Sequence, residues 1–174
     1  MLIDIRDILK LSGLEKTVEL EIEAGGCGIT DFEKECKFNE PIFVKAELSN
    51  IKGIIRAKGD VKTGYDTVCD RCLKPVHMPV HKGFDYEYVQ AGSLGEVPAE
   101  DAEVFEYTGK EIDIGHAVRD TVLLEIPIRH LCSEGCLSLC PMCGKDLNEG
   151  GCGCREPEGD IRFAALKALI DDNE

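Results

Sequence analysis

Closely spaced cysteines between residues 132 and 154 constrain the fold of this chain more than any other feature. Six of its ten cysteines lie in this stretch, and two more form a CxxC pair far upstream, at Cys69 and Cys72. Thiolates two residues apart, with glycine beside them, are common ligands of a tetrahedral metal ion. The sequence therefore predicts a metal-binding region, with ligands at Cys132, Cys136, Cys140, Cys143, Cys152 and Cys154.

These eight cysteines divide into two sets of four, the number of ligands in a structural zinc site. In one set, Asn148 and two glycines supply the turn between the pairs, which are Cys140, Cys143, Cys152 and Cys154. The other set is Cys69, Cys72, Cys132 and Cys136. Four protein ligands leave no position for water, so both zinc sites are predicted to be structural. Thiolates alone do not separate zinc from an iron–sulfur cluster, and that alternative stays open.

The charge of the chain limits what it binds. Its 174 residues carry a formal charge of −14, which repels phosphate backbones and suits a strongly basic protein partner. The start, MLIDIRDILK, lacks the features of a secretory signal, and no apolar run approaches the roughly 20 residues of a membrane helix. We therefore expect a cytoplasmic protein without membrane association. In that reducing compartment, clustered cysteines more often bind metal than form disulfides.

Alternating apolar and polar residues predict a β-rich first part. Residues 18–22 have the pattern of a half-buried strand, and residues 42–48 and 53–61 predict a hairpin. A third strand is predicted from 76 to 88, after the CxxC turn, and a short one at 104–107. Consecutive strands joined by turns favour an antiparallel sheet or small barrel.

Helical signals lie in the second half of the chain. Asp113 is a predicted N-cap for a helix over about 113–126, and Asp160 for a terminal helix of about ten residues. The predicted fold class is α+β. Residues 1–130 are expected to form an antiparallel, barrel-like sheet with one packed helix. Residues 131–174 are expected to form a Cys-rich zinc knuckle and the terminal helix, docked on the same fold.

Five cations form a candidate nucleic-acid surface. Arg56, Lys58 and Lys62 share strand parity, while Arg71 and Lys74 lie at the CxxC turn. In an antiparallel hairpin these side chains can form one surface that contacts phosphates. An ordinary solvated strand face is the alternative interpretation.

Signatures of catalysis are missing from the sequence. It contains no P-loop, GxSxG, GxGxxG or paired-carboxylate motif, so we predict a protein that is not an enzyme and has no small-molecule substrate. His130 lies beside the cysteine cluster and is an alternative metal ligand. Cys27 and Cys36 have no CxxC partner and are interpreted as isolated thiols.

Four segments, taken together, resemble the YceD family. They are GYDTVCDRCLKP at 64–75, LLEIP at 123–127, LCPMCGKDLN at 139–148 and DIRFAAL at 160–166. The resemblance implies a cytoplasmic protein without catalytic activity that supports the production or stability of large-subunit (23S) ribosomal RNA. It also maps the family's cysteine positions onto the eight candidate ligands above.

Three functional hypotheses remain open. The first is a ribosome-biogenesis factor that binds large-subunit RNA, or a pre-ribosomal particle, through the five cations. The second is an acidic chaperone or adaptor for a basic ribosomal protein, with Glu19, Glu21 and Glu23 or the acidic stretch at 96–103 supplying the charge. The third is a zinc-storage or thiol redox protein, which fast metal loss or oxidation under mild conditions would indicate.

Overall fold

The computed structural model describes residues 1–10, 12–29, 36–92 and 104–154. It divides the chain into two compact units, Met1–Glu134 and Gly135–Glu174. The elements of the first unit are β1 (Leu2–Asp4), α1 (Arg6–Leu9), β2 (Glu15–Ile22), the 3₁₀ turn η1 (Ala24–Cys27), β3 (Ile42–Ile51), β4 (Ile54–Val68), β5 (Pro75–Gln90), β6 (Val104–Tyr107), β7 (Glu111–Asp113) and α2 (Gly115–Glu125). No helix in the described ranges is long and apolar enough to cross a membrane.

Five strands of the first unit form one sheet in the order β2-β3-β4-β5-β6. The hairpins β3–β4 and β4–β5 confirm the predicted antiparallel strands, and the β4–β5 ladder runs from Ile55 opposite Tyr88 to Val68 opposite Pro75. Two expectations were wrong. The sheet is open, with β2 and β6 at its edges, so it is not a closed barrel. It is also mixed, because the predicted strand Val104–Tyr107 pairs parallel with β5.

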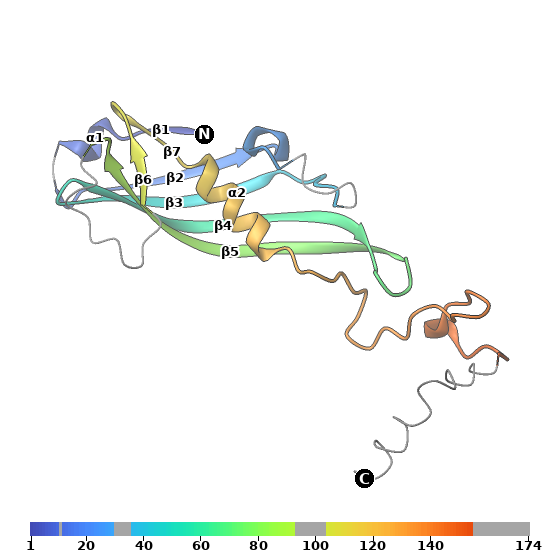
Figure 1. Ribbon diagram of the computed structural model, residues 1–174. Coiled ribbons are helices and arrows are strands. Elements are labelled where there is room, and N and C mark those ends of the chain that lie inside the picture. The colour runs from blue at the N-terminus through green and yellow to red at the C-terminus, as the bar shows by residue number, and fades with distance from the viewer. Residues whose placement is uncertain (11, 30–35, 93–103, 155–174) are drawn as a thin grey trace, which may run out of the picture. The chain divides into compact units, whose positions relative to one another are not determined.

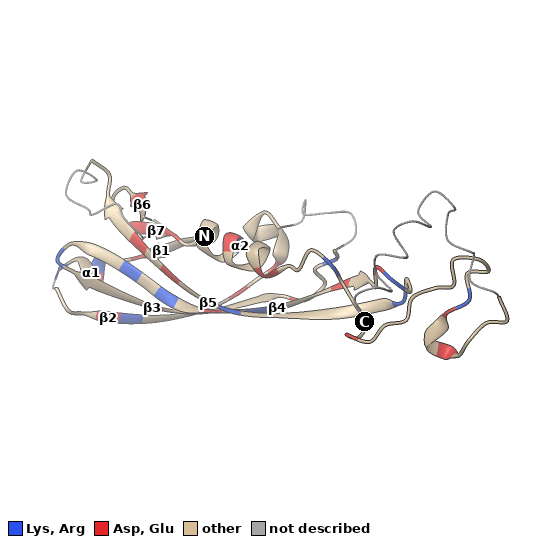
Figure 2. Ribbon diagram, turned by 60° about the horizontal axis from the view of Figure 1, so that its bottom comes forward, with Lys and Arg blue, Asp and Glu red and all other residues tan. Residues whose placement is uncertain are grey.

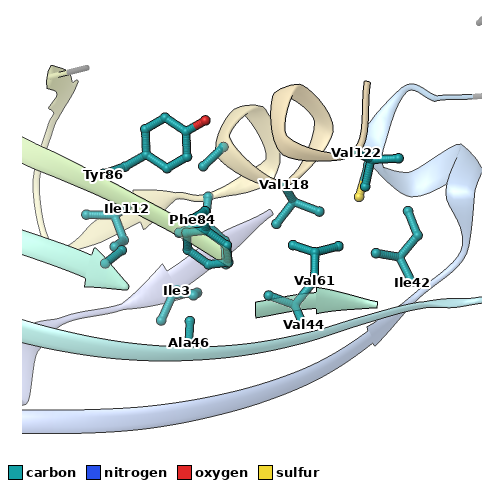
Figure 3. Packing of buried hydrophobic residues seen from close by; sticks show 14 of the residues in the cluster. Ile3, Ile42, Val44, Ala46, Val61, Phe84, Tyr86, Ile112, Val118 and Val122 are labelled. Atoms are coloured by element: carbon teal, nitrogen blue, oxygen red, sulfur yellow. The ribbon is translucent and has the colours of Figure 1, made fainter. Parts of the chain in front are cut away.

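A second layer covers one face of this sheet. Helix α2 and the two-stranded β1–β7 pair lie over that face in Figure 1. Figure 3 shows Val44 and Val61 of the sheet packed towards Val118 of the helix, with Ile3 and Ile112 of the small pair nearby. All five side chains are at most 6% exposed. Alternation along β3 and β4, interrupted at residues 63–65 where three successive residues are buried, places these apolar residues on one face and most polar residues on the other.

Helix α2 lies within the predicted span, but the predicted N-cap at Asp113 was wrong. Asp113 is the last residue of β7, and the N-cap residue is Ile114. Asp113 Oδ1 accepts a hydrogen bond of 2.8 Å from Gly115 N, which satisfies one backbone donor of the first turn. The helix ends at Glu125, two residues before Pro127. Its buried side is Ala117, Val118, Thr121 and Val122, the spacing expected of a helix that covers a sheet on one side.

The described part of the second unit is short. It contains the 3₁₀ turn η3 (Leu147–Glu149) and an isolated bridge between Leu139 and Asp146. Asp146 caps η3 by accepting a hydrogen bond from Asn148 N at 2.8 Å. The predicted terminal helix from Asp160 and the acidic stretch at 96–103 lie outside the described residues.

Candidate metal centres

The first group of cysteines is built on the turn between β4 and β5. Cys69 N donates to Lys74 O and Leu73 N donates to Cys69 O, both at 2.8 Å. These bonds curl the chain so that Cys69 and Cys72 are brought to one side. Leu73 has a φ of 58°, in the left-handed region that non-glycine residues seldom adopt. The turn is therefore a defined knuckle, which we call the first knuckle (residues 69–74).

Two hydrogen bonds, one between backbones and one to a side chain, attach the segment that carries Cys132 to this knuckle. Asp70 N donates to His130 O at 2.8 Å, and His130 N donates to Asp70 Oδ2 at 2.6 Å. The imidazole of His130 is buried, and its Nε2 is hydrogen-bonded to the hydroxyl of Tyr65 at 3.1 Å. As a result, the sulfurs of Cys72 and Cys132 lie 3.6 Å apart.

The surroundings of Cys69 favour its thiolate. Burial by itself raises the pKa of the Cys69 thiol, but hydrogen bonds from the backbone N–H groups of Cys72, Cys132 and Arg71 outweigh it and lower the pKa to about 6. Donors aimed at a sulfur stabilise its negative charge, and a thiolate is the form that binds metal.

The second group begins with a knuckle of the same construction, residues 140–145. Cys140 N donates to Lys145 O at 2.8 Å and Gly144 N donates to Cys140 O at 2.9 Å. Gly144 has a φ of 70°, and it stands at the position that Leu73 occupies in the first knuckle. Hydrogen bonds from the backbone N–H groups of Cys143 and Met142 lower the pKa of Cys140 to about 6.

The other pair of this group, Cys152 and Cys154, follows η3. Lys145 Nζ donates to Gly151 O at 3.0 Å and so ties the knuckle to the returning chain. Hydrogen bonding with the thiols of Cys143 and Cys152 raises the pKa of Cys154 to about 12. Cys140 and Cys154 thus hold their protons unequally, because neighbouring negative charges oppose one another until a cation is present.

Both groups have the donor set of a structural zinc site. The four sulfurs of Cys69, Cys72, Cys132 and Cys136 lie within 4.8 Å of one another, and the same holds for the set Cys140, Cys143, Cys152 and Cys154. Zinc–sulfur bonds of about 2.3 Å at tetrahedral angles separate the sulfurs by about 3.8 Å. The spacing therefore fits zinc, and these are the two predicted sets. Eight thiolates would bind the ions and leave no open position for a substrate.

Burial differs between the two groups. Cys69, Cys72 and Cys136 are buried, and only Cys132 of the first group is exposed. In the second group only Cys140 is buried, while Cys143 and Cys154 are exposed and Cys152 is intermediate. None of the ten cysteines forms a disulfide. Cys27 and Cys36, interpreted as isolated thiols, belong to the hydrophobic core and to neither group.

The supporting residues around the sulfurs were missed or misread in the sequence. Asp70 and His130 hold the Cys132 segment, and His130 does so through its backbone and Tyr65 rather than as a metal ligand. The sequence predicts only a turn at Asn148, but the structure gives its side chain two contacts. Its Oδ1 accepts from Leu137 N at 2.8 Å and its Nδ2 donates to Cys136 Sγ at 3.5 Å. The position of Asn148 between two cysteine pairs was the only signal available.

The five candidate cations occupy two different settings. Arg56, Lys58 and Lys62 are exposed on the uncovered face of β4, where blue and red segments alternate in Figure 2. Arg56 forms an ion pair with Asp85, its Nε lying 2.7 Å from Oδ1, and Lys58 stands between Glu47 and Asp85 in the ladder. The two cations of the first knuckle, Arg71 and Lys74, are also exposed.

Comparisons with known proteins give a consistent family. The model of the large ribosomal RNA subunit accumulation protein YceD matches residues 57–170. The chloroplastic YCED homolog 1 of Arabidopsis thaliana is 27% identical over 172 residues, covering 84% of this chain and 54% of that protein. The homolog 1 of Zea mays is 26% identical over 158 residues, covering 75% and 54%.

An uncharacterized protein of Mycobacterium bovis is 31% identical over 102 residues, covering 59% of this chain and 49% of its own. The chain thus spans about half the length of the curated relatives it matches. No solved structure matches. The family match extends over both cysteine knuckles, and it confirms the resemblance seen in the four sequence segments: this chain belongs to the YceD family of large ribosomal RNA subunit accumulation proteins.

Proposed function

We propose that this chain supports the accumulation of large-subunit ribosomal RNA by binding that RNA, or a precursor particle that contains it, through the first knuckle. The family and the two plant relatives are named for accumulation of this RNA. Direct contact with an RNA is the simplest way for a protein to protect that RNA from degradation or to assist its processing. The chain would act in a reducing compartment, the cytoplasm, where thiolates stay available for metal.

The observation that carries the proposal is the construction of the first knuckle. It presents two exposed cations, Arg71 and Lys74, on a turn with a defined backbone. The nearest acid in sequence, Asp70, has one carboxylate oxygen occupied by His130 N. Zinc bound to the four thiolates of the group would rigidify the turn. The two cations would therefore lose little conformational entropy when they bind a phosphate.

The strand cations are a weaker candidate surface. Asp85 neutralises Arg56, and Lys58 lies between two acids in the ladder. Lys62 stands between Phe43 and His81 and has no carboxylate directly opposite. Mixed charges of this kind cancel at a distance greater than the Debye length of about 8 Å. Because hydrogen bonds define the backbone of the first knuckle, we rank it first and the strand face second.

The proposed role requires no catalysis. Each candidate metal group has four cysteine ligands, so a bound zinc would be saturated and would act on the backbone of its knuckle rather than on a substrate. This assignment also gives a purpose to an isolated CxxC pair, which would hold the RNA-contacting turn in shape.

A gel-shift titration with fragments of large-subunit ribosomal RNA tests the proposal. Replacing Arg71 and Lys74 by Glu should abolish binding, and replacing Arg56 and Lys58 by Glu should weaken it less. The double variant Lys110→Glu with Arg119→Glu is the matched control, since both side chains are exposed and lie away from the knuckle in sequence.

Salt dependence makes the test quantitative. Removing two phosphate contacts should reduce the slope of log affinity against log salt by about 2. Binding by the knuckle variant that equals binding by the control variant would refute the proposed surface. Circular dichroism and zinc content of each variant show whether the fold is intact.

A further inference from the structure

Strand β2 forms a long free edge of the sheet. It is eight residues long and pairs only with β3, as Figure 1 shows at that side of the sheet. Among the described residues, the backbone of Glu15–Ile22 makes no hydrogen bond other than those of the β2–β3 ladder. Alternate N–H and C=O groups of such a strand point away from the sheet, where another strand can pair with them.

The opposite edge of the sheet is different. Strand β6 has only four residues and pairs parallel with Glu87–Gln90 of β5. The rest of β5 is also an edge among the described strands, but Pro75 and Pro79 there have no backbone N–H to offer a partner strand. A strand added there would gain few hydrogen bonds, whereas β2 offers a row of about 27 Å at roughly 3.4 Å per residue. The free edge that suits strand addition is therefore β2.

The side chains of β2 define the chemistry of a partner. On the uncovered face it presents Glu15, Thr17, Glu19 and Glu21, all exposed, and Glu23 follows directly. Among the described residues only Glu19 of these acids has an ion pair, with Lys45 Nζ at 2.8 Å. In the part of the chain that the structure describes, Glu15 and Glu21 of the strand and the following Glu23 therefore have no paired cation.

The other face of β2 is apolar and incompletely covered. Val18, Leu20 and Ile22 pack against the core but remain half-buried. Residues of the same parity on the neighbouring strand, Val44 and Ala46, are at most 2% exposed. A further strand beside β2 would bury the edge of this apolar row and release water from it.

A shallow hollow lies next to the acidic row. Its volume is about 400 Å³, and its lining includes Glu19, Glu21, Phe43 and Lys62. Glu21 is directly opposite Phe43 in the β2–β3 ladder, and Phe43 is 49% exposed. An arginine side chain placed there meets a carboxylate and the face of an aromatic ring together, which are both favourable contacts for a guanidinium.

We propose that β2 is a docking edge for an extended segment of a basic protein, in which Lys or Arg alternates with apolar residues. The segment would pair with the β2 backbone, place its cations beside Glu15, Glu19 and Glu21, and place its apolar residues beside Val18 and Leu20. This is strand addition with charge complementarity. It is independent of the RNA contact of the first knuckle.

Other occupants fit the edge less well. A second copy of this chain, paired edge to edge, would set two rows of glutamates against each other, and like charges on facing strands repel. RNA would meet the same carboxylates with its phosphates. A basic, extended polypeptide is the chemistry that satisfies the backbone, the acids and the apolar row at once.

A synthetic peptide that alternates Arg or Lys with Val provides the test. It should bind the full chain, and hydrogen exchange should show new protection of the amides in residues 15–22. Two control peptides should bind at least tenfold more weakly than the alternating peptide. One has the same composition, with its cations and its valines in separate blocks. The other carries N-methyl groups on the backbone nitrogens of one edge of the peptide strand. Equal binding by the N-methylated peptide would show that strand pairing is not used.

Variants of the protein locate the site. Glu19→Lys with Glu21→Lys should weaken the alternating peptide about tenfold or more, whereas Glu106→Lys on the opposite edge strand with Glu111→Lys should leave it unchanged. Equal effects of both pairs would overturn the proposal. Self-association of the chain through β2 would also overturn it. So would competition between large-subunit RNA and the peptide, if this competition persisted in the variant that carries Arg71→Glu and Lys74→Glu.

Discussion

Asp70 offers a direct test of how the first cysteine group is held. Its side chain touches no metal, but it accepts the backbone N–H of His130 at 2.6 Å, two residues before Cys132. Replacing Asp70 by Ala removes this charge-assisted bond. The bond from Asp70 N to His130 O and the contact of His130 Nε2 with the Tyr65 hydroxyl remain, so the Cys132 segment is held less firmly and the metal has to supply more of its order.

The size of the effect follows from the lost bond. A hydrogen bond to a charged group contributes about 1.5–3 kcal/mol, and Asp70 is exposed, so the lower value applies. About 1.5 kcal/mol corresponds to a roughly tenfold loss of zinc affinity at the first group. Removing a residue that hydrogen-bonds to a metal ligand in other proteins lowers metal affinity by about 10–100-fold, which agrees with this value. The second group should be unaffected.

Competition between the zinc-loaded chain and a chromogenic chelator measures both affinities, because the two ions leave in separate steps. The matched control is Glu134→Ala, which removes a carboxylate from the same loop without removing a hydrogen bond given by the structure. Equal losses in Asp70→Ala and Glu134→Ala would refute the argument, since general charge would then account for both. A tenfold loss in Asp70→Ala alone would support it.

Three further outcomes follow from the structure. Chelator should remove zinc first from the second group, whose sulfurs are more exposed, and cysteine alkylation followed by mass spectrometry would identify the exposed Cys143 as the first site modified. Tyr88→Phe should leave thermal stability unchanged or raise it by about 1 kcal/mol, because no group among the described residues hydrogen-bonds to the buried Tyr88 hydroxyl, and a loss in a thermal melt would contradict this. Gly59→Ala should cost about 3 kcal/mol or more in the same assay, because a Cβ there would lie 2.1 Å from Lys45 O on the neighbouring strand.

The pH dependence of one cross-strand pair has a definite sign. The hydrogen bond from Asp66 raises the pKa of His77, whose Nδ1 lies 2.9 Å from Oδ1, and the same bond lowers the pKa of Asp66. The histidine contribution to stability is present below about pH 6.5 and is lost as pH rises through its folded pKa. The aspartate contribution is present above about pH 3.9 and is lost as pH falls. The pair therefore stabilises the fold most between about pH 4 and 6.5. Asp66→Asn should return the His77 titration, followed by NMR, towards 6.5, and an unchanged titration would contradict the pairing.

Local patterns in the sequence predicted much of this structure because they depend on near neighbours. Alternation along residues 42–61 determines which side of β3 and β4 is buried, whatever the rest of the chain does. The ends of α2 depend on near neighbours, since the Asp113 carboxylate accepts from Gly115 N at the start and Pro127, which lacks a backbone N–H, follows the end by two residues. The two CxxC pairs form knuckles through bonds that span five residues. Spacing identified Cys140, Cys143, Cys152 and Cys154 as one set, and the four remaining clustered cysteines then formed the other.

Features that depend on distant contacts could not be predicted. The parallel pairing of β6 with β5 and the open edges of the sheet depend on where β1, β7 and α2 pack. The neutralisation of Arg56 by Asp85 depends on a cross-strand register between residues 29 apart. His130 seemed to be an alternative ligand because it is near Cys132 in sequence, but Tyr65 and Asp70 hold it in the structure.

The sequence by itself determined the family, the donor set for metal and the strands of the main hairpins, because cysteine spacing and two-residue alternation are local signals. Only the tertiary structure shows that Arg56 is paired with Asp85 and that β2 lies at an edge of the sheet. Charge balance and edge exposure arise only when strands are set side by side, since each depends on the residue that lies opposite rather than on the residue that comes next.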